Sequence, residues 1–180
     1  MRAGREFVAR HAALEGGRAR PYSRSDPLMT LFRIVGDVEG SSYTELLRFM
    51  SLHAASFSLT VWHKPTGSML DAIDQLRPYE NEVREVTEWP GTRLMPGRTA
   101  QLHVYRVDAA SIAELKRIAT GLFNWRNYAL PDDLCFYRAD GTVLLETIAS
   151  EGAAALHLSE QELSDLAMFP AISVRRALRN

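Results

Sequence analysis

The stretch Leu130–Ser150, LPDDLCFYRADGTVLLETIAS, holds the strongest structural signal of the chain. Its Asp140-Gly141 pair stands between two apolar runs and favours the positive backbone angles of a two-residue type I′ turn. We therefore predict an antiparallel hairpin whose strands cover Leu134–Arg138 and Val143–Thr147. The rest of the fold is expected to assemble around this hairpin.

A two-residue turn also fixes the pairing of the two strands. Phe136 is expected to face Leu145, and Arg138 is expected to face Val143. Side chains alternate between the two sides of a strand, so one face should enter the core. That face is expected to carry Leu134, Phe136, Val143 and Leu145, and the half-apolar reverse face Cys135, Tyr137, Leu144 and Glu146.

Periodicity and turn residues place the other elements around the hairpin. Strands are predicted over 28–35, 57–63, 99–107 and 153–158. Helices are predicted over 42–53, 68–76, 108–123 and 159–167. Three helix starts carry capping residues, namely Ser42 with Glu45, Asp108, and Ser159 with Glu162. The turn at 64–67 predicts a second hairpin after residues 57–63, and residues 79–97 are expected to be irregular.

Residues 28–77 and 99–150 share one order of elements, a strand, a capped helix and a hairpin. An internal duplication and a chance recurrence of a common arrangement both explain this order. In either case the sequence predicts a single α+β domain over residues 28–180. Its antiparallel or mixed sheet should be covered by two main helices, possibly as two similar β-α-β-β halves.

Composition bounds the class of protein. The chain has 180 residues and a net charge of −1, which gives no overall bias toward nucleic acid or acidic membranes. Residues 1–28 hold six arginines against three acidic residues, so the remainder carries a charge of −4. Residues 1–27 are therefore expected to form a weakly ordered basic leader. No apolar run is long enough for a membrane span or a secretory signal, and a cytoplasmic protein is expected.

Candidate catalytic groups are few in the sequence. Asp132-Asp133 could separate their pKa values for acid and base work, yet adjacent carboxylates in a turn more often bind backbone amides or nearby arginines. His63 and His103 could meet Glu146, but no histidine pair has metal-ligand spacing. Since neither a GxGxxG nor a phosphate-binding Gly-Lys-Ser/Thr motif is present, we expect no metal and no cofactor.

Three groups of residues stand out together, namely Glu88–Thr92 (EWPGT), Trp125, and Leu130–Arg138 (LPDDLCFYR). With them the chain resembles an uncharacterised family of small bacterial proteins. Some members of that family carry a stage III sporulation label. The resemblance spans roughly residues 83–166 and implies a small cytosolic bacterial protein, without supplying a reaction. Ser150 stands where the family tends to have histidine, so no imidazole role is carried over.

Large aromatic and arginine side chains near irregular segments are typical of interfaces. Turn chemistry explains the Pro and Gly residues there but not the choice of Trp or Arg. The expected binding surface comprises Trp89, Arg93, Trp125, Asp132, Asp133 and Arg138. Buried indoles that complete the core are the competing interpretation.

The sequence therefore favours a non-enzymatic binding or interaction module, an immunity-type or regulatory protein with a protein partner. The alternative is a small hydrolase that uses carboxylates near residues 130–151.

Overall fold

A computed structural model describes residues 12–15, 18–21, 29–126 and 128–177 of the chain. An eight-stranded sheet dominates it, with strand order β12-β3-β11-β10-β9-β4-β8-β5 and antiparallel pairing throughout. The strands are β3 (Thr30–Ile34), β4 (Ser56–Val61), β5 (Glu80–Val86), β8 (Ala100–Arg106), β9 (Asp132–Tyr137), β10 (Val143–Ile148), β11 (Ala153–Leu158) and β12 (Val174–Arg176). The α+β class expected from the sequence is confirmed, and its sheet is antiparallel.

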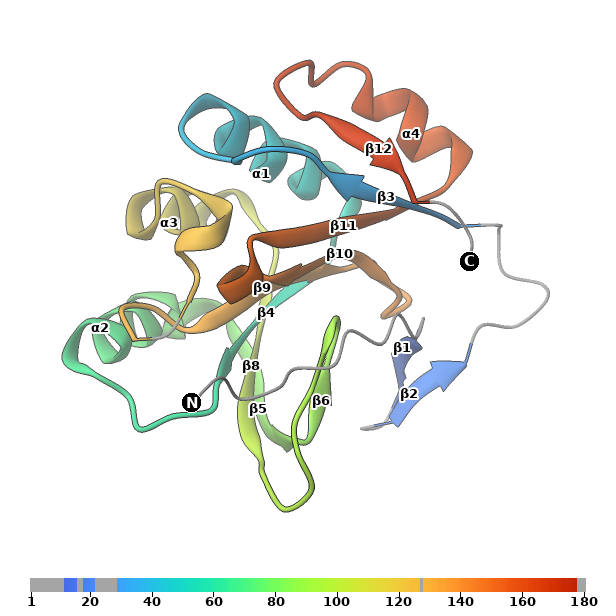
Figure 1. Ribbon diagram of the computed structural model, residues 1–180. Helices are drawn as coiled ribbons and strands as arrows, with labels where there is room; N and C mark the ends of the chain where they lie inside the picture. Colours follow the sequence, from blue (N-terminus) through green and yellow to red (C-terminus); the bar gives the residue numbers. More distant parts are fainter. Residues whose placement is uncertain (1–11, 16–17, 22–28, 127, 178–180) are drawn as a thin grey trace.

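Helices pack on one face of this sheet (Figure 1). They are α1 (Ser41–His53), α2 (Gly67–Leu76), α3 (Ala109–Ile118) and α4 (Glu160–Leu166), with short 3-10 turns η1 (Arg77–Tyr79), η2 (Leu122–Asn124) and η3 (Ala149–Glu151). The main core lies between these helices and the sheet. It includes the predicted α1 residues Leu46, Leu47, Phe49 and Met50, all fully buried.

Two small hairpins complete the described chain. One joins β6 (Glu88–Trp89) to β7 (Thr92–Arg93), and the other joins β1 (Ala12–Glu15) to β2 (Arg18–Pro21). The expected leader covers residues 1–27, most of which lie outside the described residues. Its described parts, β1 and β2, are paired strands that the sequence did not predict.

The central hairpin forms, but with a different turn. Gly141 N–H donates to Arg138 O at 2.9 Å, and Arg138 N–H donates to Thr142 O at 2.9 Å. Gly141 has φ 79°, whereas Asp140 does not adopt a positive φ. This pattern belongs to a three-residue loop with one left-handed glycine, so the type I′ prediction is wrong.

The longer loop also changes the pairing of the strands. Phe136 faces Leu145 as predicted, but Val143 faces Tyr137 rather than Arg138, and a bulge follows Val143. A bulge moves the next side chains to the other face. Val143 therefore packs with Cys135 and Tyr137 on the reverse face, while Leu144 joins the main core.

Helix capping follows the sequence at two of three sites. Asp108 accepts a hydrogen bond from Ser111 N–H at 2.7 Å, and Ser159 accepts one from Glu162 N–H at 3.2 Å, each within a capping box. The predicted Ser42–Glu45 box does not form. Helix α1 begins after Gly40, and Ser42 instead bonds with the backbone of Glu39.

Long-range pairing overrides two local predictions. β4 leads into α2 instead of a hairpin and pairs with β8 and β9. Residues 80–86, expected to be irregular, form β5 against β8. The two proposed halves thus share a strand, a helix and a strand, but the first lacks its hairpin. Duplication therefore stays a hypothesis.

Candidate functional site

The sheet face away from the helices carries an unusual row of side chains. In neighbouring strands, Arg175 of β12 pairs with Arg33 of β3, Arg33 pairs with Ala155 of β11, and Ala155 pairs with Glu146 of β10. Residues directly opposite in adjacent strands have Cβ atoms about 5 Å apart. Two arginines therefore stand next to each other, and an alanine separates them from a carboxylate.

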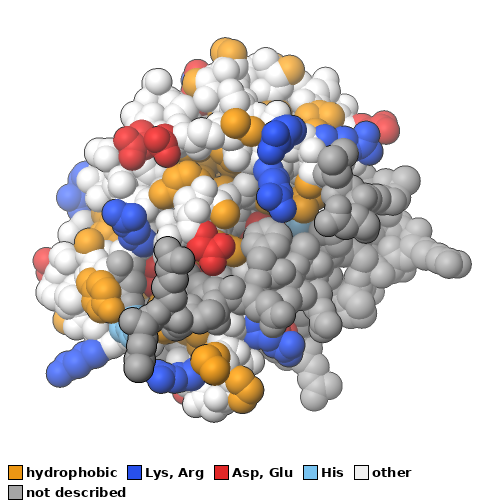
Figure 2. Space-filling view, viewed as in Figure 1, with side chains coloured by type: hydrophobic (Ala, Val, Ile, Leu, Met, Phe, Trp, Pro, Cys, Tyr) orange, Lys and Arg blue, Asp and Glu red, His pale blue; other side chains and the backbone are white. Residues whose placement is uncertain are grey.

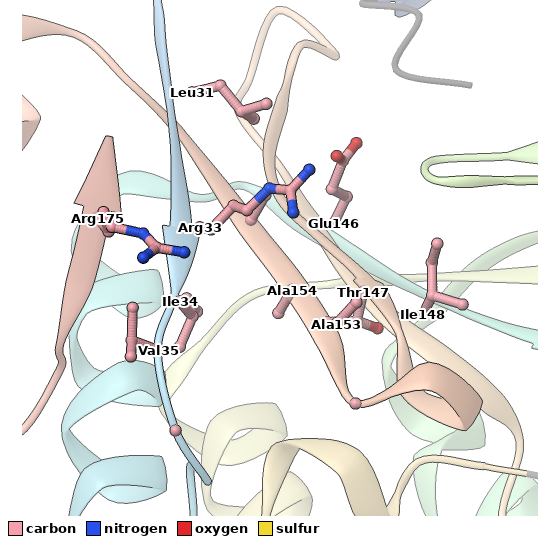
Figure 3. Close-up of a pocket in the computed structure, with 13 residues that line it drawn as sticks. Leu31, Arg33, Ile34, Val35, Glu146, Thr147, Ile148, Ala153, Ala154 and Arg175 are labelled. Atoms are coloured by element: carbon pink, nitrogen blue, oxygen red, sulfur yellow. The ribbon is translucent and has the colours of Figure 1, made fainter. Parts of the chain in front are cut away.

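This row crosses a hollow of about 310 Å³. Figure 3 shows Arg33 extending from β3 toward Glu146, with the guanidinium of Arg175 reaching toward β3. The floor consists of the alanine residues of β11, whose short methyl side chains leave space. The lining residues are Leu31, Arg33, Ile34, Val35, Gly36, Glu146, Thr147, Ile148, Gly152, Ala153, Ala154, Ala155 and Arg175.

The two arginines are exposed, and Arg175 has no ion-pair or hydrogen-bond partner within the part of the chain that the structure describes. Figure 2 shows basic side chains beside hydrophobic ones over the region where β3 and β12 lie in Figure 1. Like charges directly opposite in a sheet are destabilising.

The acidic side of the hollow is more enclosed. Glu146 is 8% exposed and His157 is 4% exposed, and His157 Nε2 lies 3.2 Å from Glu146 Oε2. The pair joins β10 to β11, and Glu146 lines the hollow. His103, which the sequence brought near Glu146, instead lies 2.8 Å from Glu80 Oε1.

Beyond Glu146, the side chains on the reverse face of the sheet are buried from solvent. Burial, followed by the negative charge of Asp133, raises the pKa of the Cys135 thiol well above its usual value. Burial likewise raises the pKa of Tyr137, whose hydroxyl lies 2.8 Å from Ser58 Oγ. A protonated thiol is a poor nucleophile, so Cys135 serves as a core residue.

Asp133 anchors the β6–β7 hairpin to the sheet. It has φ 58° at an irregular position of the β4–β9 pairing, and a bulge of this kind can redirect a side chain. Its carboxylate accepts hydrogen bonds from Trp89 Nε1 at 2.8 Å and Ala149 N–H at 2.8 Å. Thr92 Oγ1 donates a longer bond of 3.4 Å.

The hairpin in turn supports the hollow. Gly91 has φ 76°, and a Cβ there would lie 3.1 Å from a side-chain carbon of Ile148, which lines the hollow. Glycine at this turn therefore permits close packing against β10.

The structure separates the residues of the expected binding surface. Trp89, Asp132 and Asp133 do come together, but all three are buried. Asp132 accepts a hydrogen bond from Trp62 Nε1. Arg93 is exposed and lies 3.2 Å from Glu88 in an ion pair.

Trp125 is fully buried in the main core on the opposite face, where its Nε1 donates to Tyr43 Oη at 2.8 Å. Arg138 lies about 16 Å along β9 from Asp133 at the usual strand rise. It pairs there with Glu162 at 2.7 Å. The expectation that Trp89, Trp125 and Arg138 share one exposed surface is therefore wrong.

Sequence reasoning missed Arg33, Arg175 and the alanine floor between the arginines and Glu146. The charged Arg33 inside the apolar run LFRIV was a usable signal, because successive side chains of a strand point to opposite faces. Arg33 is therefore expected on the face opposite to Phe32. The pairing with Arg175 could not be read from the sequence, because more than a hundred residues separate the two strands.

Among the described residues, no group of three or more His, Cys, Asp or Glu side chains is placed to hold a metal ion. In the same part of the chain, no helix is long and apolar enough to cross a membrane.

Comparison of the chain with protein-family models, curated proteins and solved structures found no match. The resemblance noted from the sequence therefore stays a prediction.

Proposed function

We propose that this chain is a non-enzymatic binding module of a regulatory kind, and that the hollow beside Arg33 and Arg175 holds its ligand. The observation that carries the proposal is an arginine pair at directly opposed positions beside an alanine floor. A ligand that contacts both guanidinium groups would offset the repulsion between these neighbouring charges. The sequence also led us to expect a bacterial cytosolic protein with a protein partner. Both expectations are compatible with this role, but neither is the argument for it.

Hydrolysis has less support from the geometry. The carboxylate of Asp133 is fully buried and accepts three hydrogen bonds, so it holds structure together rather than facing a substrate. Glu146 reaches the hollow, but its carboxylate lies 3.2 Å from His157 Nε2. The thiol of Cys135 is buried and stays protonated. These contacts favour binding over turnover.

A variant that fills the hollow tests this proposal. Ala153 lines the hollow and is partly exposed, so Ala153→Leu should occupy ligand space without entering the main core. Ala113→Leu makes the same change on the exposed face of α3 and serves as the matched control. Both proteins and the parent chain are screened against one library of small polar and charged molecules by ligand-observed NMR.

The expected result is a set of molecules that bind the parent chain and Ala113→Leu but not Ala153→Leu. Identical binding to all three proteins would contradict the proposal, provided that circular dichroism shows each to be folded.

A further inference from the structure

We propose that the outer edge of β5 pairs with the same edge of a second copy of this chain, so that two eight-stranded sheets join across a two-fold axis. Strand β5 ends the sheet on the side opposite to β12, and no described strand pairs with its outer edge (Figure 1). The inference concerns a different part of the molecule from the hollow and does not depend on the proposed function.

The outer edge of β5 is long and open. β5 has seven residues, whereas the other edge strand, β12, has three. Edge strands that avoid pairing are commonly short or interrupted by proline. β5 contains no proline, and the irregularity in its pairing with β8 lies near its start. Its exposed side chains are Asn81, Glu82, Val83 and Glu85.

Symmetry limits how two such edges can pair. In an antiparallel pair, a residue whose amide and carbonyl point toward the other strand faces another such residue, and these residues alternate along the strand. In a two-fold pair of identical strands, the axis therefore passes through one residue, which faces its own copy. The possible axis positions inside β5 are residues 81–85.

Charge selects one of these positions. An axis at Glu82, Arg84 or Glu85 places that residue directly opposite the like charge of its own copy. An axis at Asn81 places glutamates opposite glutamates on both sides of the axis. Like charges at directly opposed positions are destabilising. Among these positions, only an axis at Val83 avoids all such contacts.

An axis at Val83 also creates favourable contacts. Val83 is 45% exposed in one chain and would face the same valine of the second copy. Glu82 of each copy would face Arg84 of the other, which gives two pairs of opposite charge.

The contact between these charges inside one chain leaves them available. Arg84 Nη1 lies 3.7 Å from Glu82 Oε1, and the glutamate side chain is 53% exposed. A charge-assisted hydrogen bond is about 2.7–2.9 Å long, so each group can gain a closer partner. Arg84 Nε has no hydrogen-bond partner among the described residues, so the guanidinium keeps an unused donor.

The expected dimer is weak. A pairing confined to one seven-residue strand is smaller than a standard interface of about 1,600 Å². Its affinity comes mainly from backbone hydrogen bonds between the two edges, while the side chains set the register. Association should therefore depend on protein concentration.

Charge variants test the register by sedimentation equilibrium of the full chain. The apparent mass of the parent chain should rise from one copy toward two as its concentration increases. Glu82→Arg places arginines opposite arginines and should weaken association about tenfold or more. Glu85→Arg makes the same charge change on the same strand but faces Asn81 of the second copy. It should associate as the parent chain does.

A complementary pair of variants makes the test sharper. Arg84→Glu should weaken self-association as Glu82→Arg does, because glutamates then face glutamates. An equal mixture of Glu82→Arg and Arg84→Glu should associate again, since every arginine at these positions then faces a glutamate of the other variant. Circular dichroism verifies that each variant is folded.

A covalent test works without charge changes. With the axis at Val83, the Cα atoms of the two copies of this residue lie about 4.5–5.5 Å apart, which is within the range that a disulfide spans. The copies of Asn81 lie about 13 Å apart at the usual strand rise. Val83→Cys should therefore form a disulfide-linked dimer in air, whereas Asn81→Cys should not. The native Cys135 is buried.

Any of the following results would overturn the inference. A parent chain that stays monomeric at every concentration would reject the dimer. Equal effects of Glu82→Arg and Glu85→Arg would show that the contact does not have this register. The same conclusion would follow if a mixture of two folded charge variants failed to associate, or if Asn81→Cys formed the disulfide as readily as Val83→Cys.

Discussion

Replacing Arg138 with methionine should be among the most damaging single changes in the hairpin. Arg138 donates hydrogen bonds to both oxygens of Glu162, at 2.7 and 2.8 Å, and to Val143 O at 2.8 Å. It also donates to His157 O. The two charged side chains are only 12% and 11% exposed. Arg138 therefore connects the hairpin to β11 and to the start of α4.

The expected cost follows from what Arg138→Met leaves behind. The carboxylate of Glu162 would remain nearly buried without its counter-charge, and two backbone carbonyls would lose a donor. Removal of one partner from a buried ion pair costs about 3–5 kcal/mol. Arg138→Met with Glu162→Gln should cost less than the sum of the two single changes, by about 0.5–3 kcal/mol for residues in contact.

The assay is equilibrium unfolding in urea, at neutral and at acidic pH. Burial alone would raise the pKa of Glu162, but hydrogen bonds from Arg138 and from the Ser159 amide hold it below its usual value. The stabilisation from a depressed pKa is present above the unfolded-state pKa and is lost as pH falls through the folded-state pKa. The difference between the parent chain and Arg138→Met should therefore shrink on acidification. A cost below about 1 kcal/mol at neutral pH, the range of exposed pairs, would refute this reasoning.

Changes at three further positions test the architecture by the same unfolding assay. Gly141→Val should cost about 1–3 kcal/mol, because a β-branched side chain is strained at φ 79°, and a neutral result would contradict the observed turn. Asp133→Ala should cost roughly 3 kcal/mol through the loss of acceptors for buried donors. Asparagine tolerates a positive φ, so Asp133→Asn should cost less than Asp133→Ala. Equal costs for the two variants would argue against a contribution of backbone strain at position 133. Asp108→Ala should cost about 1 kcal/mol by removing the cap of α3, and no loss would show that the capping box is dispensable.

Local signals were sufficient for much of the fold. The Asp108 and Ser159 caps were predicted because a cap depends on residues three positions apart. The hairpin was predicted from Gly141, although its loop holds one more residue than a type I′ turn. That single residue moved Val143 to the reverse face, since strand side chains alternate with a period of two.

Tertiary contacts decided what local signals could not. β5 was read as irregular because its residues are mostly polar, and pairing with β8 makes it a strand. Trp89 and Trp125 were placed on an expected binding surface, with buried indoles as the competing interpretation. Both indoles are buried, and each N–H finds a buried acceptor in Asp133 or Tyr43. A buried indole needs such a partner, and the sequence does not show which residue supplies it.

The candidate site was the least predictable part of the molecule. Its arginines, its alanine floor and Glu146 come from four strands, and only the pairing of those strands brings them into one row. Arg33 could be placed on a sheet face from its apolar neighbours. Nothing in the sequence indicated that Arg175 would lie beside it.

The most direct test of the ligand site is backbone amide chemical-shift mapping of the ¹⁵N-labelled full chain during titration with a screened molecule that binds the parent chain but not Ala153→Leu. The account predicts that the largest shifts occur at Arg33, Ala155, Arg175 and their strand neighbours, with little change at Trp89 and Arg93 in the β6–β7 hairpin. Shifts centred on that hairpin, with β3 and β12 unchanged, would contradict the claim that the hollow is the binding site.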